Sequence, residues 1–480
     1  MLYSLRRLAR WRDAVCFCAV SFIGQAQAQM PPDIGALSRP DIAVNSTPPE
    51  NTNAAATSAA RRAVSPTVAL YFNAIQGASS ADLVRRALAA NGELGAVRLE
   101  ATRARARLRQ AGLRPNPIID FEHTTGRLTG SADESETSVG FGLPIELGGK
   151  RRRRIELAQA ELEAVEAEIS DRERRLANDV RALYVDALAS LRELETTEGL
   201  TNIDLKTVVV VQARVSEGDT APIELNQLRV EVDRLRSRRA LVEGRLRSAL
   251  IRLKNLTGTP PAEVLQLRED INAPGLPPPP ASREAAIEIA LRTRPDLRLA
   301  RLNEEVAQAG LKLARAQGAS DVTAFTRYTQ SRSAFDDTPV GILRDKDKLL
   351  TFGVSVSIPV FNKNQGAKAE AAIAISQARA RREFLEAVVR ADVQSAYARY
   401  EAARAAVESF ESGVIERSNE NIRTIRAAYE IGAFRITDLL VEQRRLVDSQ
   451  REFTEALAEQ YRALSDLQSA IGTAVEPQQQ

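Results

Sequence analysis

The chain has 480 residues, in which 66 Lys and Arg nearly balance 63 Asp and Glu, and its formal net charge is +3. This balance provides no electrostatic case for a nucleic-acid partner. Aromatic residues make up only 5% of the chain and charged residues 27%, which favours long helices with charged faces over a thick globular core.

The side chains that most enzyme and metal sites need are scarce. His123 is the single histidine, and the two cysteines are Cys16 and Cys18. A Cys/His zinc site, a disulfide framework and a histidine-dependent nucleophile therefore have almost nothing to be built from. The sequence also contains no Gly-rich phosphate loop and no nucleophile elbow. We expect no catalytic residue, no cofactor and no bound metal, and hence not an enzyme.

Residues 1–28 have the form of a secretory signal peptide. Four arginines precede an apolar stretch from Ala14 to Gly24, and Ala26-Gln27-Ala28 fits the small-x-small pattern of a cleavage site. An uncleaved membrane anchor is the alternative, but the stretch is short for a helix that must span about 30 Å. No later segment is apolar over about 18 consecutive residues. A membrane location would therefore have to use β-strands, in an exported, unlipidated chain without disulfides.

After the signal peptide, composition divides the chain into segments. Residues 29–80 are rich in Pro, Ala, Ser, Thr and Asn and predict an extended N-terminal arm. A first structural repeat is expected over 81–260 and a second over 283–475, followed by a tail at 476–480. The Pro-rich segment 261–282 separates the two repeats, because no helix can cross it.

The two halves resemble each other at a nearly constant offset. Three pairs of segments match: Asn178–Tyr184 with Ala391–Tyr397, Gly142–Ile145 with Ser357–Val360, and Gly218 plus Glu224 with Gly432 plus Asp438. Matches at nearly one offset indicate an internal duplication.

Each half predicts one helix, two short strands and then two very long helices. The first helix is expected over Leu83–Gln110 in one half and Arg283–Gln317 in the other. In the long helices apolar residues recur every seven positions, which is typical of coiled-coil packing, as in the series Ile155, Leu162, Ile169, Leu176 and Leu183. The helix predicted from Lys150 to Val215 would be on the order of 100 Å long at 1.5 Å per residue.

Four segments alternate apolar and polar residues as half-buried strands do. Two lie near Ile119–His123 and Val139–Leu143, the third covers Asp321–Thr329, and the fourth covers Leu350–Val360. Between the last two strands, an external loop is expected to contain Asp336, Asp337, Asp345 and Asp347. Four strands cannot close a transmembrane barrel, since single-chain barrels need at least eight. Several copies of the chain would have to share one.

Three motifs carry a resemblance to a known family. They are Arg114-Pro115-Asn116-Pro117, Leu143-Pro144-Ile145-Glu146-Leu147-Gly148-Gly149-Lys150, and Tyr429-x-x-Gly432 followed by Asp438-Leu439-Leu440. Over residues 81–475 the chain resembles the TolC-type outer membrane efflux proteins, and the second motif is most similar to the branch that serves cobalt-zinc-cadmium exporters.

The resemblance implies a mostly helical TolC-like α/β barrel with internal duplication. In the outer membrane of a bacterium, three chains would contribute four strands each to a twelve-stranded transmembrane barrel, which a coiled-coil tunnel continues across the periplasm. The homotrimer would contact outer membrane lipid and dock onto a periplasmic adaptor and an inner-membrane pump of the resistance-nodulation-division type. Heavy-metal cations are the expected substrate. Drug efflux, type I protein secretion and a periplasmic adaptor or coiled-coil scaffold are the alternatives.

Two groups of residues are candidates for function. Asp438 and its repeat counterpart Glu224 follow the helix-turn glycines Gly432 and Gly218, so three copies could present carboxylate rings that favour cations at a tunnel entrance. The resemblance implies that Tyr429, with Arg435 one position after the usual arginine, latches this entrance. A solvated helix face is the alternative. At the barrel rim, the basic residues Lys150, Arg151 and Arg152 would touch lipid headgroups or simply begin a solvated helix.

Overall fold

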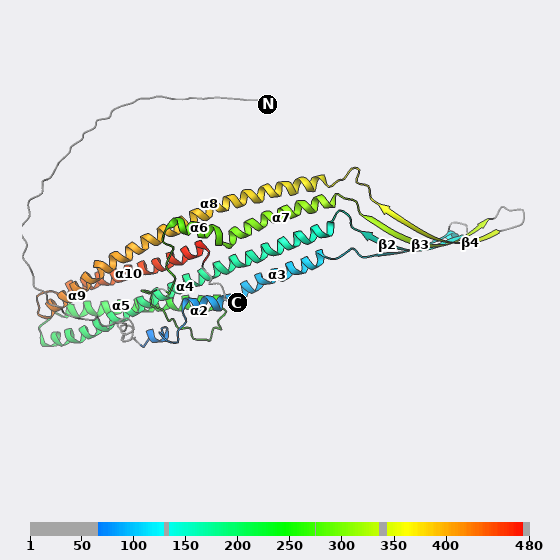
Figure 1. Ribbon diagram of the computed structural model, residues 1–480. Coiled ribbons are helices and arrows are strands. Elements are labelled where there is room, and N and C mark those ends of the chain that lie inside the picture. Colours follow the sequence, from blue (N-terminus) through cyan, green and yellow to red (C-terminus); the bar gives the residue numbers. More distant parts are fainter. Residues whose placement is uncertain (1–65, 129–133, 274, 336–342, 474–480) are drawn as a thin grey trace, which may run out of the picture. The chain divides into compact units, whose positions relative to one another are not determined.

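The structure is a computed structural model that describes residues 66–128, 134–273, 275–335 and 343–473, all within one compact unit, Ala63–Gln480 (Figure 1). The first half contains η1 (Val68–Leu70), α2 (Ser80–Ala90), α3 (Gly92–Ala111), β1 (Ile118–Thr125), η2 (Gly126–Leu128), β2 (Ser135–Ile145), α4 (Lys150–Glu217) and α5 (Pro222–Leu256). The second half contains α6 (Arg283–Thr293), α7 (Pro295–Gln317), β3 (Val322–Phe335), β4 (Leu343–Val356), α8 (Gln365–Ser409), the π-helical turn η3 (Phe410–Val414), α9 (Ile415–Glu430) and α10 (Ile436–Ile471). The repeated order of elements confirms the predicted duplication.

The first helix of each repeat is two helices, so the predictions of one unbroken helix over Leu83–Gln110 and over Arg283–Gln317 were wrong. The first break is at Asn91, which ends α2 and whose Oδ1 accepts a hydrogen bond of 2.9 Å from Leu94 N to cap α3. The second is at Arg294, which has an extended backbone and directly precedes Pro295. The helical conformation is disfavoured for a residue that precedes proline.

The long helices form the body of the unit. The single helix α4 has 68 residues, or on the order of 100 Å at 1.5 Å per residue, and it packs against α3, α5, α7 and α10. Figure 1 shows the sheet at one end of α4 and the turn to α5 at the other. The matching helix of the second repeat is interrupted by the π-helical turn at Phe410–Val414, which separates α8 from α9. The seven-residue apolar step from Val407 to Val414 therefore does not lie in one continuous α-helix.

The largest apolar core lies around the middle of α4. Its fully buried side chains include Tyr184, Leu246, Leu253, Leu267 and Tyr461. Leu267 belongs to the Pro-rich segment, and it forms isolated β-bridges with Phe72 and with Ala78. The end of the expected N-terminal arm and the segment between the repeats are therefore packed onto the long helices.

The four strands form one antiparallel sheet in the order β1-β2-β3-β4. Across the sheet Ile119 pairs with Phe141, Phe141 with Thr326, and Thr326 with Phe352, so these residues share one face. That face carries exposed apolar side chains: Ile119, Phe121, Val139, Phe141, Leu350, Phe352, Val354 and Val356. On the opposite face the Arg327 guanidinium lies 2.9 Å from the Asp120 carboxylate. The sheet is thus apolar on one side and charged on the other.

The last two strands differ in extent from the prediction. β3 runs past Thr329 to Phe335, and β4 begins at Leu343 and ends at Val356, short of the predicted end at Val360. Asp345 and Asp347 therefore lie in β4, opposite Ser333 and Ser331, and not in a loop. The backbone ladder continues through these polar residues because strand pairing needs only N–H and C=O groups. Asp336 and Asp337 lie outside the described residues.

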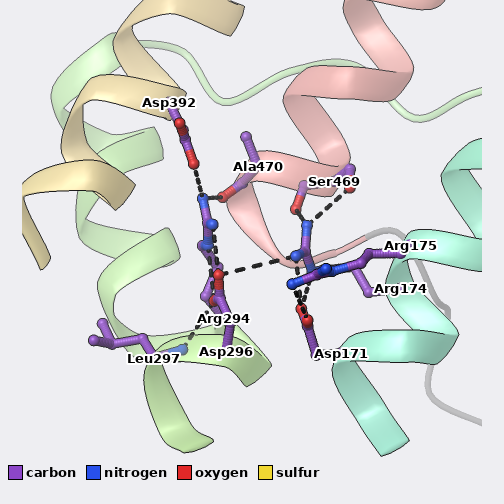
Figure 2. A network of polar contacts seen from close by, with 9 residues as sticks. All are labelled: Asp171, Arg174, Arg175, Arg294, Asp296, Leu297, Asp392, Ser469 and Ala470. Carbon is purple, nitrogen blue, oxygen red and sulfur yellow. Dashed lines mark hydrogen bonds and ion pairs between the residues drawn. The ribbon is translucent and has the colours of Figure 1, made fainter. Parts of the chain in front are cut away.

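A buried polar network joins the two repeats near the end of α10. Figure 2 shows its members: Asp171, Arg174, Arg175, Arg294, Asp296, Leu297, Asp392, Ser469 and Ala470. Arg174 of α4 donates to the Asp171 carboxylate at 2.6 Å and to the carbonyl oxygen of Ser469 at 2.9 Å. Arg294, only 6% exposed, lies 2.6 Å from Asp296 and 3.0 Å from Asp392. The arginines thus hold the last turn of α10 to helices of both repeats.

Candidate functional site

The ends of the long helices are set by two glycines. Gly218 (φ +85°) follows α4, and Gly432 (φ +77°) follows α9. These left-handed conformations favour glycine because other side chains meet the backbone there. The N–H of Gly218 donates to Val215 O at 3.2 Å, and that of Gly432 donates to Tyr429 O at 3.0 Å. Both predicted turn glycines therefore close a helix and send the chain back along it.

Tyr429 lies where the two helix turns approach each other. Its side chain is buried, and the Arg214 guanidinium lies 5.9 Å from the centre of its ring, a cation–π distance. Arg214 also donates to Glu430 O at 2.9 Å. Burial raises the pKa of the Tyr429 hydroxyl, and the Glu224 carboxylate raises it further. Among the described residues this hydroxyl forms no hydrogen bond of regular geometry, although the Glu224 carboxylate is close enough to act on it. Within the described chain, the cation that lies over Tyr429 is thus Arg214 of α4.

Asp438 and Arg435 meet through the backbone. The Asp438 carboxylate accepts a hydrogen bond of 3.1 Å from the Arg435 N–H and so caps the first turn of α10. Asp438 and Arg435 are exposed, whereas Glu224, in the first turn of α5, is half-buried. The structure therefore brings Glu224 close to Tyr429, and it gives Asp438 a local capping role that leaves the carboxylate accessible.

The region beside Tyr429 also contains cationic groups that sequence reasoning missed. A cavity of about 290 Å³ is lined by Lys206, Arg214, Arg426, Tyr429 and Leu439, among others. Lys206 and Arg214 are on α4, far from Tyr429 in sequence, and no motif marks them. Only the packing of α4 against α9 and α10 brings these side chains together.

The basic run at the start of α4 is engaged in contacts within the chain. Lys150 Nζ lies 2.7 Å from Asp321 Oδ2, Arg151 Nε donates to Gly112 O at 2.7 Å, and Arg152 Nε lies 3.0 Å from Glu156 Oε1. Asp321 and Gly112 belong to the connections between helices and strands. Lys150 and Arg151 therefore hold the start of α4 to these connections, whereas Arg152 pairs within its own helix. Arg151 and Arg152 remain exposed.

The lone histidine is on the exposed side of β1. His123 Nδ1 lies 2.9 Å from the hydroxyl of Thr137, its partner across the ladder. Within the described residues, no cluster of three or more His, Cys, Asp or Glu side chains could hold a metal ion.

The profile of the outer membrane efflux proteins matches residues 83–259 and 286–473, most of both repeats. The chain belongs to the outer membrane efflux protein family. This membership confirms the family, the fold class and the outer membrane location expected from the sequence. Within the described ranges, no helix has both the length and the apolar composition needed to cross a membrane.

Relatives of this outer membrane efflux protein are known by sequence and by structure. The cobalt-zinc-cadmium resistance protein CzcC of Cupriavidus metallidurans is 23% identical over 396 residues, which cover 80% of this chain and 88% of CzcC. The structure of CusC, described in terms of transmembrane channel formation, has a TM-score of 0.67 at 19% identity and covers 84% of this chain and 96% of its own. The open MtrE outer membrane channel of Neisseria gonorrhoeae has a TM-score of 0.66 at 20% identity, covering 82% and 89%. Both solved structures share the fold, and both are described as channels.

Proposed function

We propose that the chain is the outer membrane channel of a tripartite efflux system and conducts heavy-metal cations passively out of the cell. The observation that carries this proposal is the continuity of α4 (Lys150–Glu217), which starts beside an apolar-faced sheet and ends at a turn beside ionisable residues. A single rigid helix links the two ends of the conduction path. Heavy metals are the proposed cargo because the relative named for cobalt-zinc-cadmium resistance aligns with most of the chain.

The sheet supports assembly as a homotrimer. β1 and β4 are its two edges in the described part of the chain, and unpaired strand edges invite pairing with another chain. A barrel needs at least eight strands, so three copies with four strands each would form one of twelve. The exposed apolar face, with Phe352 75% exposed, would then contact outer membrane lipid, and the face of Arg327 would line the channel.

The opposite end would be the periplasmic entrance. Three copies of Asp438 and Glu224 would surround it with carboxylates, which attract cations and repel anions. Tyr429 would help to hold the closed arrangement through its contact with Arg214, and Arg435 would fix the first turn of α10. An adaptor protein in the periplasm and an inner-membrane pump of the resistance-nodulation-division type would deliver the substrate to this end.

Purification from outer membranes in detergent, followed by native mass measurement and planar-bilayer recording, tests the proposal. We expect a trimer that forms a cation-selective pore. Recovery as a soluble periplasmic monomer would instead support an adaptor or scaffold protein. To test the cargo, deletion of the gene should raise sensitivity to cobalt, zinc or cadmium. Increased sensitivity to drugs alone would overturn the assignment of metal cations.

A further inference from the structure

Asp204 of α4 is a carboxylate that neither the family motifs nor the proposed entrance residues include. Its side chain is only 2% exposed. Oδ1 accepts a hydrogen bond of 2.7 Å from Gln443 Nε2 of α10, across 239 positions of sequence. Within the described residues, Oδ2 is buried without a hydrogen-bond partner. One half of this carboxylate is therefore satisfied by a neighbouring helix and the other half is not.

Charged groups from two further helices act on Asp204. Glu231 of α5 is buried and lies 2.9 Å from Arg444 of α10. Arg426 is on α9. Burial raises the pKa of Asp204 to about 6, the hydrogen bond from Gln443 opposes this rise, Glu231 adds to it and Arg426 opposes it. Because Glu231 is already paired with Arg444, Asp204 is the carboxylate of this cluster that is free to take up a proton.

The position of Asp204 links it to the entrance end. Its neighbour Ile203 lines the same cavity as Arg426, Tyr429 and Leu439. An apolar cluster drawn from α4, α5, α9 and α10 packs this end of the unit, and its buried members include Val211, Leu228, Ile422, Leu439 and Leu446. The hydrogen bond from Gln443 thus connects two of the helices whose packing sets the conformation around Tyr429.

We propose that Asp204 joins α4 to α10 in a proton-dependent way. It holds the entrance end closed when its carboxylate is protonated and loosens that end when the carboxylate is ionised. This inference rests on the proposed function of that end. A protonated Asp204 still accepts from Gln443, and its Oδ2 carries the hydrogen, so no buried charge remains. An ionised Asp204 leaves a charge in a buried site with one oxygen unsatisfied, which is costly. Loosening the helices admits water to the carboxylate.

The direction of the pH effect follows from the raised pKa. The stabilisation by protonated Asp204 is complete below the ordinary aspartate value of about 3.9 and is lost as pH rises through about 6. If water restores the ordinary value in the open state, the open-to-closed ratio should rise about tenfold per subunit between pH 5 and pH 8. The entrance is thus tighter in acid and looser at neutral pH.

The test is planar-bilayer conductance of the purified trimer from pH 5 to pH 8, together with its chemical unfolding over the same range. In Asp204→Asn the side chain is neutral at every pH, so conductance and stability should stay near the acid values of the parent. Asp233→Asn, at an exposed α5 residue, is the matched control and should keep the parent's pH dependence. Gln443→Leu removes the opposing hydrogen bond and should move the transition to higher pH.

Each outcome decides the matter. A transition near pH 6 that is seen in the parent and persists in Asp204→Asn would overturn the proposed role of Asp204. If Asp204→Asn does not fold, an unchanged transition in Gln443→Leu would overturn it as well. A protein without conductance at any pH would contradict the proposed channel, yet the unfolding data would still test Asp204, because parent stability must fall through pH 6 and that of Asp204→Asn must not.

Discussion

The Asp438 carboxylate has a structural contact and a free charge at the same time. Its Oδ2 caps α10 through the Arg435 N–H at 3.1 Å, while the side chain stays exposed. In Asp438→Asn an oxygen acceptor remains for the cap, but the charge is lost. We expect the stability to change by less than about 0.5 kcal/mol and the cation selectivity to fall, since the entrance ring is neutralised. Reversal potentials across a salt gradient measure the selectivity.

Asp448→Asn is the control for this substitution, because Asp448 is exposed on the same helix but lies away from its first turn. It should leave the reversal potential unchanged. Equal selectivity in Asp438→Asn and the parent would put Asp438 on a solvated face, and loss of the trimer would mean that its role is packing.

Individual residues were predictable from sequence only where a local motif marks them. Gly218 and Gly432 stand out because helix ends require a left-handed residue, and Tyr429 stands out through its motif. Arg214 could not be predicted as the partner of Tyr429, nor Asp204 as that of Gln443, because each pair joins helices from different repeats. Such contacts depend on how the helices pack, which local patterns do not specify.

At the scale of elements, both repeats fasten the break in their first helix pair to the end of their last helix. Asn91 Nδ2 donates to Leu256 O at 2.9 Å in the first repeat, and Thr293 Oγ1 donates to Ile471 O at 2.7 Å in the second. The second repeat adds the buried Arg294 to this joint (Figure 2). The breaks are therefore attachment points, and Pro295 was the local signal for one of them.

Arg294→Met should destabilise this joint strongly. The substitution leaves the largely buried Asp296, whose side chain is 13% exposed, without its main cation, and breaking a buried ion pair costs about 3 to 5 kcal/mol. Arg399→Met on α8 is the control, because Arg399 pairs with Glu459 at 3.0 Å on the surface and should cost less than about 1 kcal/mol. Guanidinium unfolding followed by circular dichroism compares the two. Equal effects would show that the Arg294 pair is solvated in solution.

The same joint predicts an acid-dependent stability. Burial alone would raise the pKa of Asp296, but the hydrogen bond and charge of Arg294 hold it below its ordinary value. Its contribution to stability is thus present above about pH 3.9 and is lost as pH falls through the lowered folded value. Between pH 5 and pH 3 the parent should lose more stability than Arg294→Met, as urea midpoints at each pH would record. A parallel loss in both proteins would contradict this assignment.

At the scale of the whole molecule, the two faces of the sheet should respond differently to charge. Phe352→Arg puts a charge on the apolar face in the middle of the apolar part of β4 and should cost about 2 to 4 kcal/mol, whereas Val356→Arg at the strand end should cost about 0 to 1 kcal/mol. Ser355→Arg, on the opposite face, should be tolerated. Folding measurements in lipid vesicles test this order. A larger cost for Ser355→Arg would reverse the assignment of the faces.

Much of the architecture could be predicted because its signals are periodic and local. Alternation predicted the strands, the seven-residue step predicted the long helices, and two matching halves predicted the duplication. The extent of β3 and β4 was not predictable, because Asp345 and Asp347 look like loop residues until the partner strand is known. The network around Arg294 was equally hidden, since its members come from α4, α7, α8 and α10 and no local signal connects them.

The open edges of the sheet have a genetic consequence. If every barrel draws its strands from three chains, each β4 must pair with the β1 of another copy. One defective chain would then inactivate a trimer that also contains two normal chains. Alleles that damage an edge strand but leave α4 and α10 able to pack should therefore be dominant over the normal gene. Alleles that prevent the helices from folding should be recessive, because such chains never join the others.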